Sequence, residues 1–531
     1  MIQCKADMVL KGAAFFYGRK DAGYRGKDIN FVAVKDGRIV GIGKEGEDAD
    51  FTGPDTKVYE FTKDRLIMPG IHDNHVHLLQ AGMLSKYADL YSARTEEEAV
   101  AMAKEYADAH PDDKWIIGIG WSKYAFKGLP NKKSIDAVIS DRPVMLMDDE
   151  LHSAWVNTAA LEIAGIINET PDPDYGEIQR DENGEATGFL YETALSIAAR
   201  IAFDFTDEQV EELVSTYMEK ALRYGITSIT DMTPYLGIDL SYMNAYLKMA
   251  KEDKLKIRIN AALDLFADIK DVTAKRAKAE AEGNGFYRIP FLKQFVDGVP
   301  GNHTAMMLED YSDRPGEKGG ALLDLDKLND AIEAAHLHGM SVRLHACGDA
   351  AVRAALDGYE NAIIRHGRGT SRHQVEHIEV IDPADIERFA KAGIMASVQP
   401  EHVVSGMPSF ADNNYPEILG PERTKYTWVF RQLLDTGAVL AGGSDCPVVE
   451  GSPFAGIYSG LERLHDDGTP EGGWNPQEKL TIEELLEIYT YGAAYGEGLE
   501  NQIGTLGEGM IADIVVLDRN LLDVPSDQIK D

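Results

Sequence analysis

Short apolar runs alternate with amphipathic stretches along most of the chain. From residue 226 onward each apolar run is followed by a stretch with helical spacing of its apolar positions. The runs that we interpret as strands are Ile226–Thr230, Lys256–Leu263, Pro290–Val296, Ser341–His345, Gln374–Ile378, Ile394–Val398 and Ala438–Gly443. With Leu66–His77 as the first strand, they make eight strand–helix units. This alternation is typical of a parallel sheet, and the pattern predicts an α/β fold closed as a (β/α)8 TIM barrel.

Two regions depart from this repeat. Residues 80–205 are too long for one crossover, so we expect an inserted subdomain after the first barrel strand, ending before a capping box at Thr206 and Gln209. Residues 1–65 show short β-rich runs and turns, and a further strand is expected over Ala512–Asp518. We therefore predict a composite β-sandwich from residues 1–65 plus 500–531, around a barrel domain spanning 66–499.

Composition narrows the classes of partner. The 531 residues carry 53 Lys and Arg against 89 Asp and Glu, a formal net charge of −36, which disfavours nucleic acid and anionic membranes. Apolar runs stay well short of the roughly 18 residues that span a bilayer, and the first residues lack a signal-peptide layout. We expect a cytoplasmic protein that acts on a small-molecule substrate, without a nucleic-acid or membrane partner.

Candidate metal-binding and catalytic residues lie at the ends of the predicted strands. His75 and His77 stand two residues apart, so their imidazoles can converge on one point. The residues at the strand ends are His75, His77, Lys293, His345, His377 and Asp445. Each one alone is more often structural, but together they predict a site for one or two divalent ions, with zinc favoured and iron or manganese compatible. Other histidines, including His72, His336 and His373, lie on predicted loops or helices, and we expect them to be ordinary surface residues.

Lys293 has three interpretations. Burial lowers the pKa of a lysine, and a neutral amine can add CO2 to form a carbamate, an anionic ligand that bridges two metals. Lys293 could instead pair with Asp297, or Glu192 of the insertion could supply the carboxylate.

These motifs, with the stretches around Trp115–Trp121, His152–Asn157 and Gly443–Val448, resemble the amidohydrolase superfamily. More closely they resemble amidohydrolase family 3, the YtcJ-like and N-substituted formamide deformylase-like branch. The resemblance implies that His75 and His77 bind one metal and His345 and His377 the other. It also implies that a Lys293 carbamate bridges them, and that Asp445 contacts the metal and moves protons. Relatives are usually dimers, so a homodimer is expected.

The reaction that follows from this resemblance is hydrolysis of a non-peptide C–N bond in an amide, N-formyl or N-acyl amine. The alternative hypothesis is a hydrolase that acts on an ester, lactone or phosphoester. A third hypothesis is a non-catalytic binding protein on the same scaffold. His303 stands where relatives often carry Arg, and either it or His152 is expected to stabilise the oxyanion. The residues that we expect as cavity wall or as packing within the insertion are Trp121, Tyr124, Phe126, His152 and Trp155.

Overall fold

Eight parallel strands form the central sheet of this computed structural model, which describes residues 5–21, 23–25, 28–123, 125–126, 128–233, 238, 240–405 and 407–530. In sheet order the strands are β7 (Ile71–Val76), β14 (Ile226–Asp231), β15 (Arg258–Asp264), β16 (Tyr287–Phe295), β17 (Ser341–Ala346), β18 (Gln374–His377), β19 (Met395–Val398) and β20 (Leu440–Gly442). A parallel bridge between Val76 and Cys446 joins the first strand to the residues after the last. The barrel predicted from the apolar runs is confirmed.

Helices follow the strands and cover the outside of the barrel. They are α6 (Asp207–Arg223), α7 (Met243–Lys251), α8 (Ile269–Glu282), α9 (Leu325–Leu337), α10 (Asp349–His366), α11 (Pro383–Ala392), α13 (Phe430–Asp435), α14 (Pro453–Glu462) and α15 (Ile482–Glu487). The predicted capping box at Thr206 and Gln209 begins α6. No helix among the described residues combines the length and apolar character needed to cross a bilayer.

The run Leu66–His77 is two strands, not the one predicted. Gly70 separates β6 (Leu66–Pro69) from β7, and a Cβ at Gly70 would lie 2.1 Å from Thr227 Oγ1. β6 leaves the barrel and lies between β2 (Ala14–Phe15) and β21 (Ile514–Leu517). Both ends of the chain therefore contribute to one small sheet. A four-stranded sheet accompanies it, formed by β4 (Arg38–Gly43), β3 (Phe31–Lys35), β1 (Met8–Lys11) and β5 (Lys57–Glu60).

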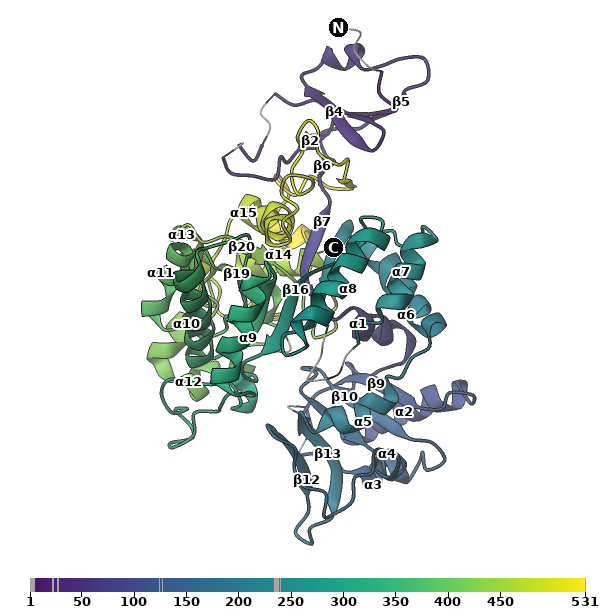
Figure 1. The fold of residues 1–531 in the computed structure, drawn as a ribbon, viewed down its shortest axis with the longest axis vertical. Helices are drawn as coiled ribbons and strands as arrows, with labels where there is room; N and C mark the ends of the chain where they lie inside the picture. Colours follow the sequence, from purple (N-terminus) through teal and green to yellow (C-terminus); the bar gives the residue numbers. More distant parts are fainter. Residues whose placement is uncertain are drawn as a thin grey trace.

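The residues between β7 and α6 contain a second sheet. Its six strands, in order, are β12 (Gly176–Arg180), β13 (Ala186–Glu192), β11 (Ser153–Val156), β10 (Val144–Asp148), β9 (Ile116–Trp121) and β8 (Ala88–Asp89). Its helices are α1 (Leu78–Lys86), α2 (Glu96–Ala109), α3 (Lys132–Asp136), α4 (Thr158–Ala164) and α5 (Leu195–Ala202). Figure 1 shows the terminal sheets, the barrel and this inserted region following one another along the long axis of the molecule.

The aromatic residues expected around the cavity lie mostly inside the inserted region. Trp121, Phe126 and Trp155 belong to its own buried core, with the ring centroids of Trp121 and Trp155 6.2 Å apart. These rings therefore pack the insertion, the alternative that the sequence left open. His152 does line the cavity, and Tyr124 lies outside the described residues.

Candidate metal centre

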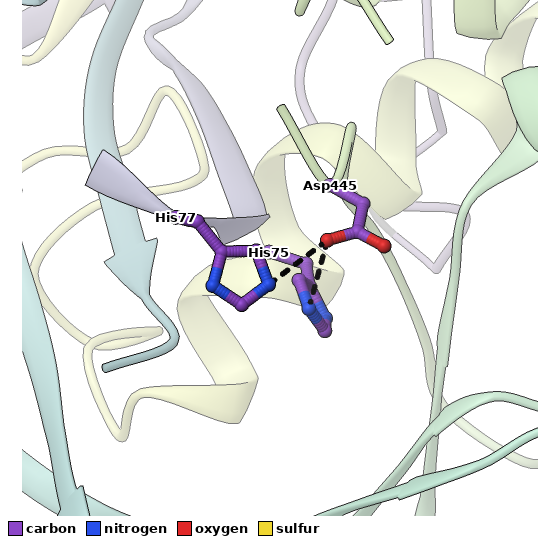
Figure 2. Close-up of side chains that lie close together, drawn as sticks. All are labelled: His75, His77 and Asp445. Carbon is purple, nitrogen blue, oxygen red and sulfur yellow. Dashed lines mark ion pairs between the residues drawn. The ribbon is translucent and has the colours of Figure 1, made fainter. Parts of the chain in front are cut away.

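Three side chains from the two ends of the barrel sheet converge at one point. His75 is in β7, His77 follows it, and Asp445 follows β20. Oδ1 of Asp445 lies 3.3 Å from Nε2 of His75 and 3.2 Å from Nε2 of His77 (Figure 2). Donor atoms around a tetrahedral zinc, each about 2.0–2.1 Å from the ion, lie about 3.3 Å apart. The spacing of these atoms therefore suits a shared cation.

The protonation of His75 explains why a cation fits between these groups. Its Nδ1–H donates to Oε2 of Glu376 at 2.7 Å, so the lone pair is on Nε2 and faces the Asp445 carboxylate. Burial also lowers the pKa of His75 well below its usual range, which disfavours a second proton. Nε2 of His75 and Oδ1 of Asp445 are both buried and lack a hydrogen-bond partner among the described residues. Two lone pairs facing each other repel, and a cation between them would replace this repulsion with attraction.

A tight turn after β20 holds Asp445 in place. The Asp73 carboxylate accepts hydrogen bonds from Ser444 N at 2.8 Å and from Ser444 Oγ at 2.6 Å. Asp445 N donates to the carbonyl of His75 at 2.7 Å, and Asp445 itself is left-handed, with φ 63°. Asp73 therefore does not point at the same place as His75 and His77. It fixes the turn that presents Asp445 to them.

Two further histidines lie beside the first pair. The ring centroid of His377 is 4.8 Å from that of His75 and 4.4 Å from that of His345. Burial lowers the pKa of both His345 and His377 well below the usual range, so both rings are neutral and able to bind a metal. Nδ1 of His377 is 3.8 Å from Oδ2 of Asp445. The structure thus brings four of the sequence-selected histidines and Asp445 into one cluster.

Lys293 lies in β16 on the inside of the barrel, fully buried. Its Nζ is 4.3 Å from the ring centroid of Phe295 and has no hydrogen-bond partner among the described residues. Burial lowers the pKa of Lys293 to about 8. Asp297, the alternative partner, instead accepts backbone N–H bonds from Met306, Cys347 and Gly348.

His152 and Glu192 form a buried pair at the insertion side of the site. Nδ1 of His152 is 2.8 Å from Oε2 of Glu192, and the His152 ring centroid is 5.6 Å from that of His345. Burial by itself lowers the pKa of His152, but the Glu192 carboxylate outweighs it and raises the pKa to about 9. His152 therefore carries a proton that it can donate at neutral pH.

His303 lies farther along the loop after β16. Its Nε2 is 2.9 Å from Oδ2 of Asp313, and its ring packs against Tyr311. Among the described residues that line the cavity, His303 is absent, whereas Val299 and Gly301 of the same loop are present.

A cavity of about 760 Å³ lies between the inserted region and the ends of the barrel strands. His77, His345, His377 and Asp445 line it from the barrel, and residues 149–152 line it from the insertion. Its aromatic lining consists of Tyr91, Phe295, Tyr415, Trp428 and Tyr458. A volume of this size is typical of a small-molecule site.

Sequence reasoning missed two residues of the cluster. His402 follows β19, and its Nε2 is 4.0 Å from Oδ2 of Asp445. The signal was available, because β19 was the one late barrel strand at whose end no candidate ligand had been selected. Glu376 directly precedes His377, but its contact with His75 joins residues 301 positions apart and left no local pattern.

Comparison with known proteins agrees with this architecture. Residues 62–531 match the amidohydrolase family, and the chain belongs to that family. The putative amidohydrolase YtcJ of Bacillus subtilis (strain 168) is 32% identical over 92% of this chain and 90% of its own. The N-substituted formamide deformylase of Arthrobacter pascens is 25% identical over 94% of this chain and 92% of its own.

A solved structure extends the agreement to the whole fold. It is described as an uncharacterized metal-dependent hydrolase from Pyrococcus horikoshii OT3, and it superposes with a TM-score of 0.77 at 24% identity. The match covers 98% of this chain and 99% of that one. The barrel, the terminal sheets and the insertion are therefore one shared architecture.

Proposed function

We propose that this protein is a metal-dependent hydrolase that cleaves a non-peptide C–N bond, in an amide, an N-formyl amine or an N-acyl amine. The observation that carries the proposal is the convergence of His75 Nε2 and His77 Nε2 on Asp445 Oδ1, at the base of a small-molecule cavity. The likeness to a formamide deformylase over 94% of the chain supports the C–N bond rather than an ester, lactone or phosphoester.

The donor set supports zinc, with iron or manganese as substitutes, because imidazole nitrogens dominate it. His75, His77 and Asp445 would hold one ion, and His345 and His377 a second. Lys293 would supply an anionic oxygen ligand to this centre once its amine nitrogen has added CO2 and released one proton. The support for this modification is the buried Nζ that lacks a hydrogen-bond partner among the described residues.

In the reaction, a bound divalent ion would supply hydroxide at neutral pH by lowering the pKa of a water ligand. Asp445 then accepts a proton and passes it to the leaving nitrogen, because its carboxylate reaches both the histidines and the cavity. His152 donates a hydrogen bond to the developing oxyanion. We assign this role to His152 rather than His303, because His152 is the one that lines the cavity among the described residues.

The test is turnover of a substrate panel by the metal-loaded protein. N-formyl and N-acyl amines form one arm, and esters, lactones and phosphoesters of similar size form the other. We expect the first arm to be hydrolysed and His377→Ala to abolish turnover while the protein stays folded. His338→Ala is the matched control, because His338 is exposed and bonds only locally to Ala334 O among the described residues.

Each outcome assigns a reaction class. Undiminished turnover by His377→Ala removes the proposed centre from the chemistry. Preference for the second arm replaces the C–N assignment with another bond on the same barrel. Metal binding without hydrolysis of any substrate in either arm supports the hypothesis of a non-catalytic binding protein.

A further inference from the structure

We propose that Glu379, Tyr415 and Trp428 form a subsite for an organic ammonium group of the substrate. This subsite rests on the proposed function for the identity of the reaction. It adds the prediction that the substrate carries a cationic nitrogen in addition to the bond that is cleaved. All three residues line the cavity that contains the histidine cluster.

The chain after β18 places Glu379 beside the histidines. His377 and Ile378 are both left-handed, with φ 73° and 53°, a conformation that is rare for a β-branched residue. Ile378 N donates to Ala346 O at 3.2 Å, which helps to hold this turn. Two residues after His377, the Glu379 carbonyl accepts a hydrogen bond from Trp428 N at 3.0 Å. The carboxylate is thus fixed at the cavity wall, two positions from a proposed metal ligand.

The Glu379 carboxyl group is buried and has no cationic partner in the part of the chain that the structure describes. It is 7% exposed, and Tyr415 Oη donates a hydrogen bond to its Oε2. No Lys or Arg of the described part of the chain forms an ion pair with it. Ionising a buried carboxyl group without a counter-charge is costly, and an ammonium ion from the ligand would offset this cost.

The neighbouring rings suit the same ligand. The ring centroids of Tyr415 and Trp428 are 4.7 Å apart, and both residues line the cavity with Glu379. Trp and Tyr faces attract organic cations, and the attraction grows when water is excluded. A carboxylate bonded to Tyr415, whose ring contacts that of Trp428, suits alkylated and arylalkyl ammonium groups better than hydrated inorganic cations.

Other acidic residues also belong to the cavity lining. Asp149, Glu401 and Asp466 also line the cavity without an ion pair to Lys or Arg among the described residues. The basic groups of the described lining are Arg94, Lys530 and the protonated His152. Acidic residues outnumber basic ones in this lining, which favours a cationic group over an anionic one.

The experiment measures dissociation constants on the full-length, metal-loaded protein by isothermal titration calorimetry. The probes are benzyltrimethylammonium, benzyl alcohol and phenylmethanesulfonate, which share a ring and differ in charge. The quaternary ion has no lone pair, so it cannot bind the metal. We expect wild type to bind it at least about tenfold more tightly than the other two probes, and Glu379→Gln to remove that preference.

Glu450→Gln is the matched control. Glu450 also lines the cavity, but its side chain is 69% exposed, so we expect less than a twofold change. Equal affinity for the three probes in wild type overturns the subsite without requiring any variant to fold. Loss of cation preference in Glu450→Gln but not in Glu379→Gln overturns it as well.

Binding of these probes does not depend on turnover, so the two proposals fail separately. A protein that prefers the cation but hydrolyses no amide contradicts the C–N assignment and supports the subsite. A protein that hydrolyses neutral N-acyl amines and binds all three probes equally contradicts the subsite alone.

Discussion

Glu376 holds His75 in a single orientation inside the barrel. Nδ1 of His75 and Oε2 of Glu376 are 2.7 Å apart, and both side chains are fully buried. Arg343 lies 3.6 Å from the other oxygen of Glu376 and bonds to Glu497. A carboxylate that accepts the Nδ1–H of a metal-binding histidine fixes its tautomer and makes Nε2 a better electron donor. We therefore expect Glu376 to control metal affinity without touching the ion.

Glu376→Gln should weaken metal binding by about 10–100-fold, the usual cost of losing such a partner. The amide can still accept the hydrogen bond, but it brings no negative charge to the imidazole. Competition with a chelator of known affinity measures the dissociation constant directly and needs no substrate.

Glu422→Gln is the control for the loss of one carboxylate, since the side chain of Glu422 is 81% exposed. It should change the metal dissociation constant by less than twofold. If Glu376→Gln and Glu422→Gln behave alike, the Glu376–His75 contact is structural only.

Lys293→Ala should reduce the metal content. If a Lys293 carbamate bridges two ions, wild type binds close to two per chain and the variant close to one, because the bridging oxygen ligands are lost. Plasma mass spectrometry of the purified proteins gives the count, and adding bicarbonate during reconstitution should raise it in wild type only.

Lys391→Ala serves as the comparison, with a side chain that is 72% exposed. One ion per chain in wild type, unchanged in Lys293→Ala, would remove Lys293 from the centre. The buried Nζ would then need another explanation.

The barrel was predictable because local pattern and long-range structure agree there. Fully buried parallel strands are continuous apolar runs, and their ends meet on one face of the barrel. His345 and Asp445 could therefore be selected from sequence although 100 positions separate them. The split at Gly70 was missed, although Pro69-Gly70 is a pair that often interrupts a strand.

The main feature that the sequence analysis did not predict is the burial of polar side chains that bond to distant partners. His72, His336 and His373 were expected at the surface, and all three are buried. Their burial is stable because each finds a partner far along the chain, such as Thr230 for His72. Such a pairing leaves no periodic signal in the sequence.

Trp155→Ala tests the position of the aromatic residues in the insertion. Trp155 is fully buried beside Trp121, so the substitution should lower the free energy of unfolding by about 3–5 kcal/mol. Probe preference in the cavity should not change. Urea unfolding measures the free energy of unfolding, and titration calorimetry measures the probe preference.

Val138→Ala, at a 44% exposed site of the same region, should stay within about 0.5 kcal/mol of wild type. A Trp155→Ala protein of wild-type stability with altered probe preference would return Trp155 to the cavity wall.

His373 and His336 form a chain of hydrogen bonds that runs in one direction. Val342 N donates to Nδ1 of His373 at 3.1 Å, so the proton of that ring is on Nε2, 3.0 Å from Nδ1 of His336. His336 in turn donates from Nε2 to Gly367 O at 2.8 Å. The His373 ring must be neutral, because a proton on its Nδ1 would break the first bond.

This arrangement should make the fold acid-sensitive. Burial lowers the pKa of His373 to about 3, from an ordinary value near 6.5. Below pH 6.5 the unfolded chain binds a proton that the native protein excludes, so this contribution to stability is complete above pH 6.5 and is lost as pH falls towards 3. At pH 5 the loss is about 2 kcal/mol for this residue.

Urea unfolding between pH 7.5 and pH 5 checks this value by comparing wild type with His373→Gln, which does not titrate in this range. The free energy of unfolding of wild type should fall about 2 kcal/mol further than that of the variant. His338→Gln, at an exposed histidine, should follow wild type across the range. Parallel pH profiles for wild type and His373→Gln would mean that His373 becomes protonated in the native protein, and that the hydrogen-bond chain does not exclude the proton.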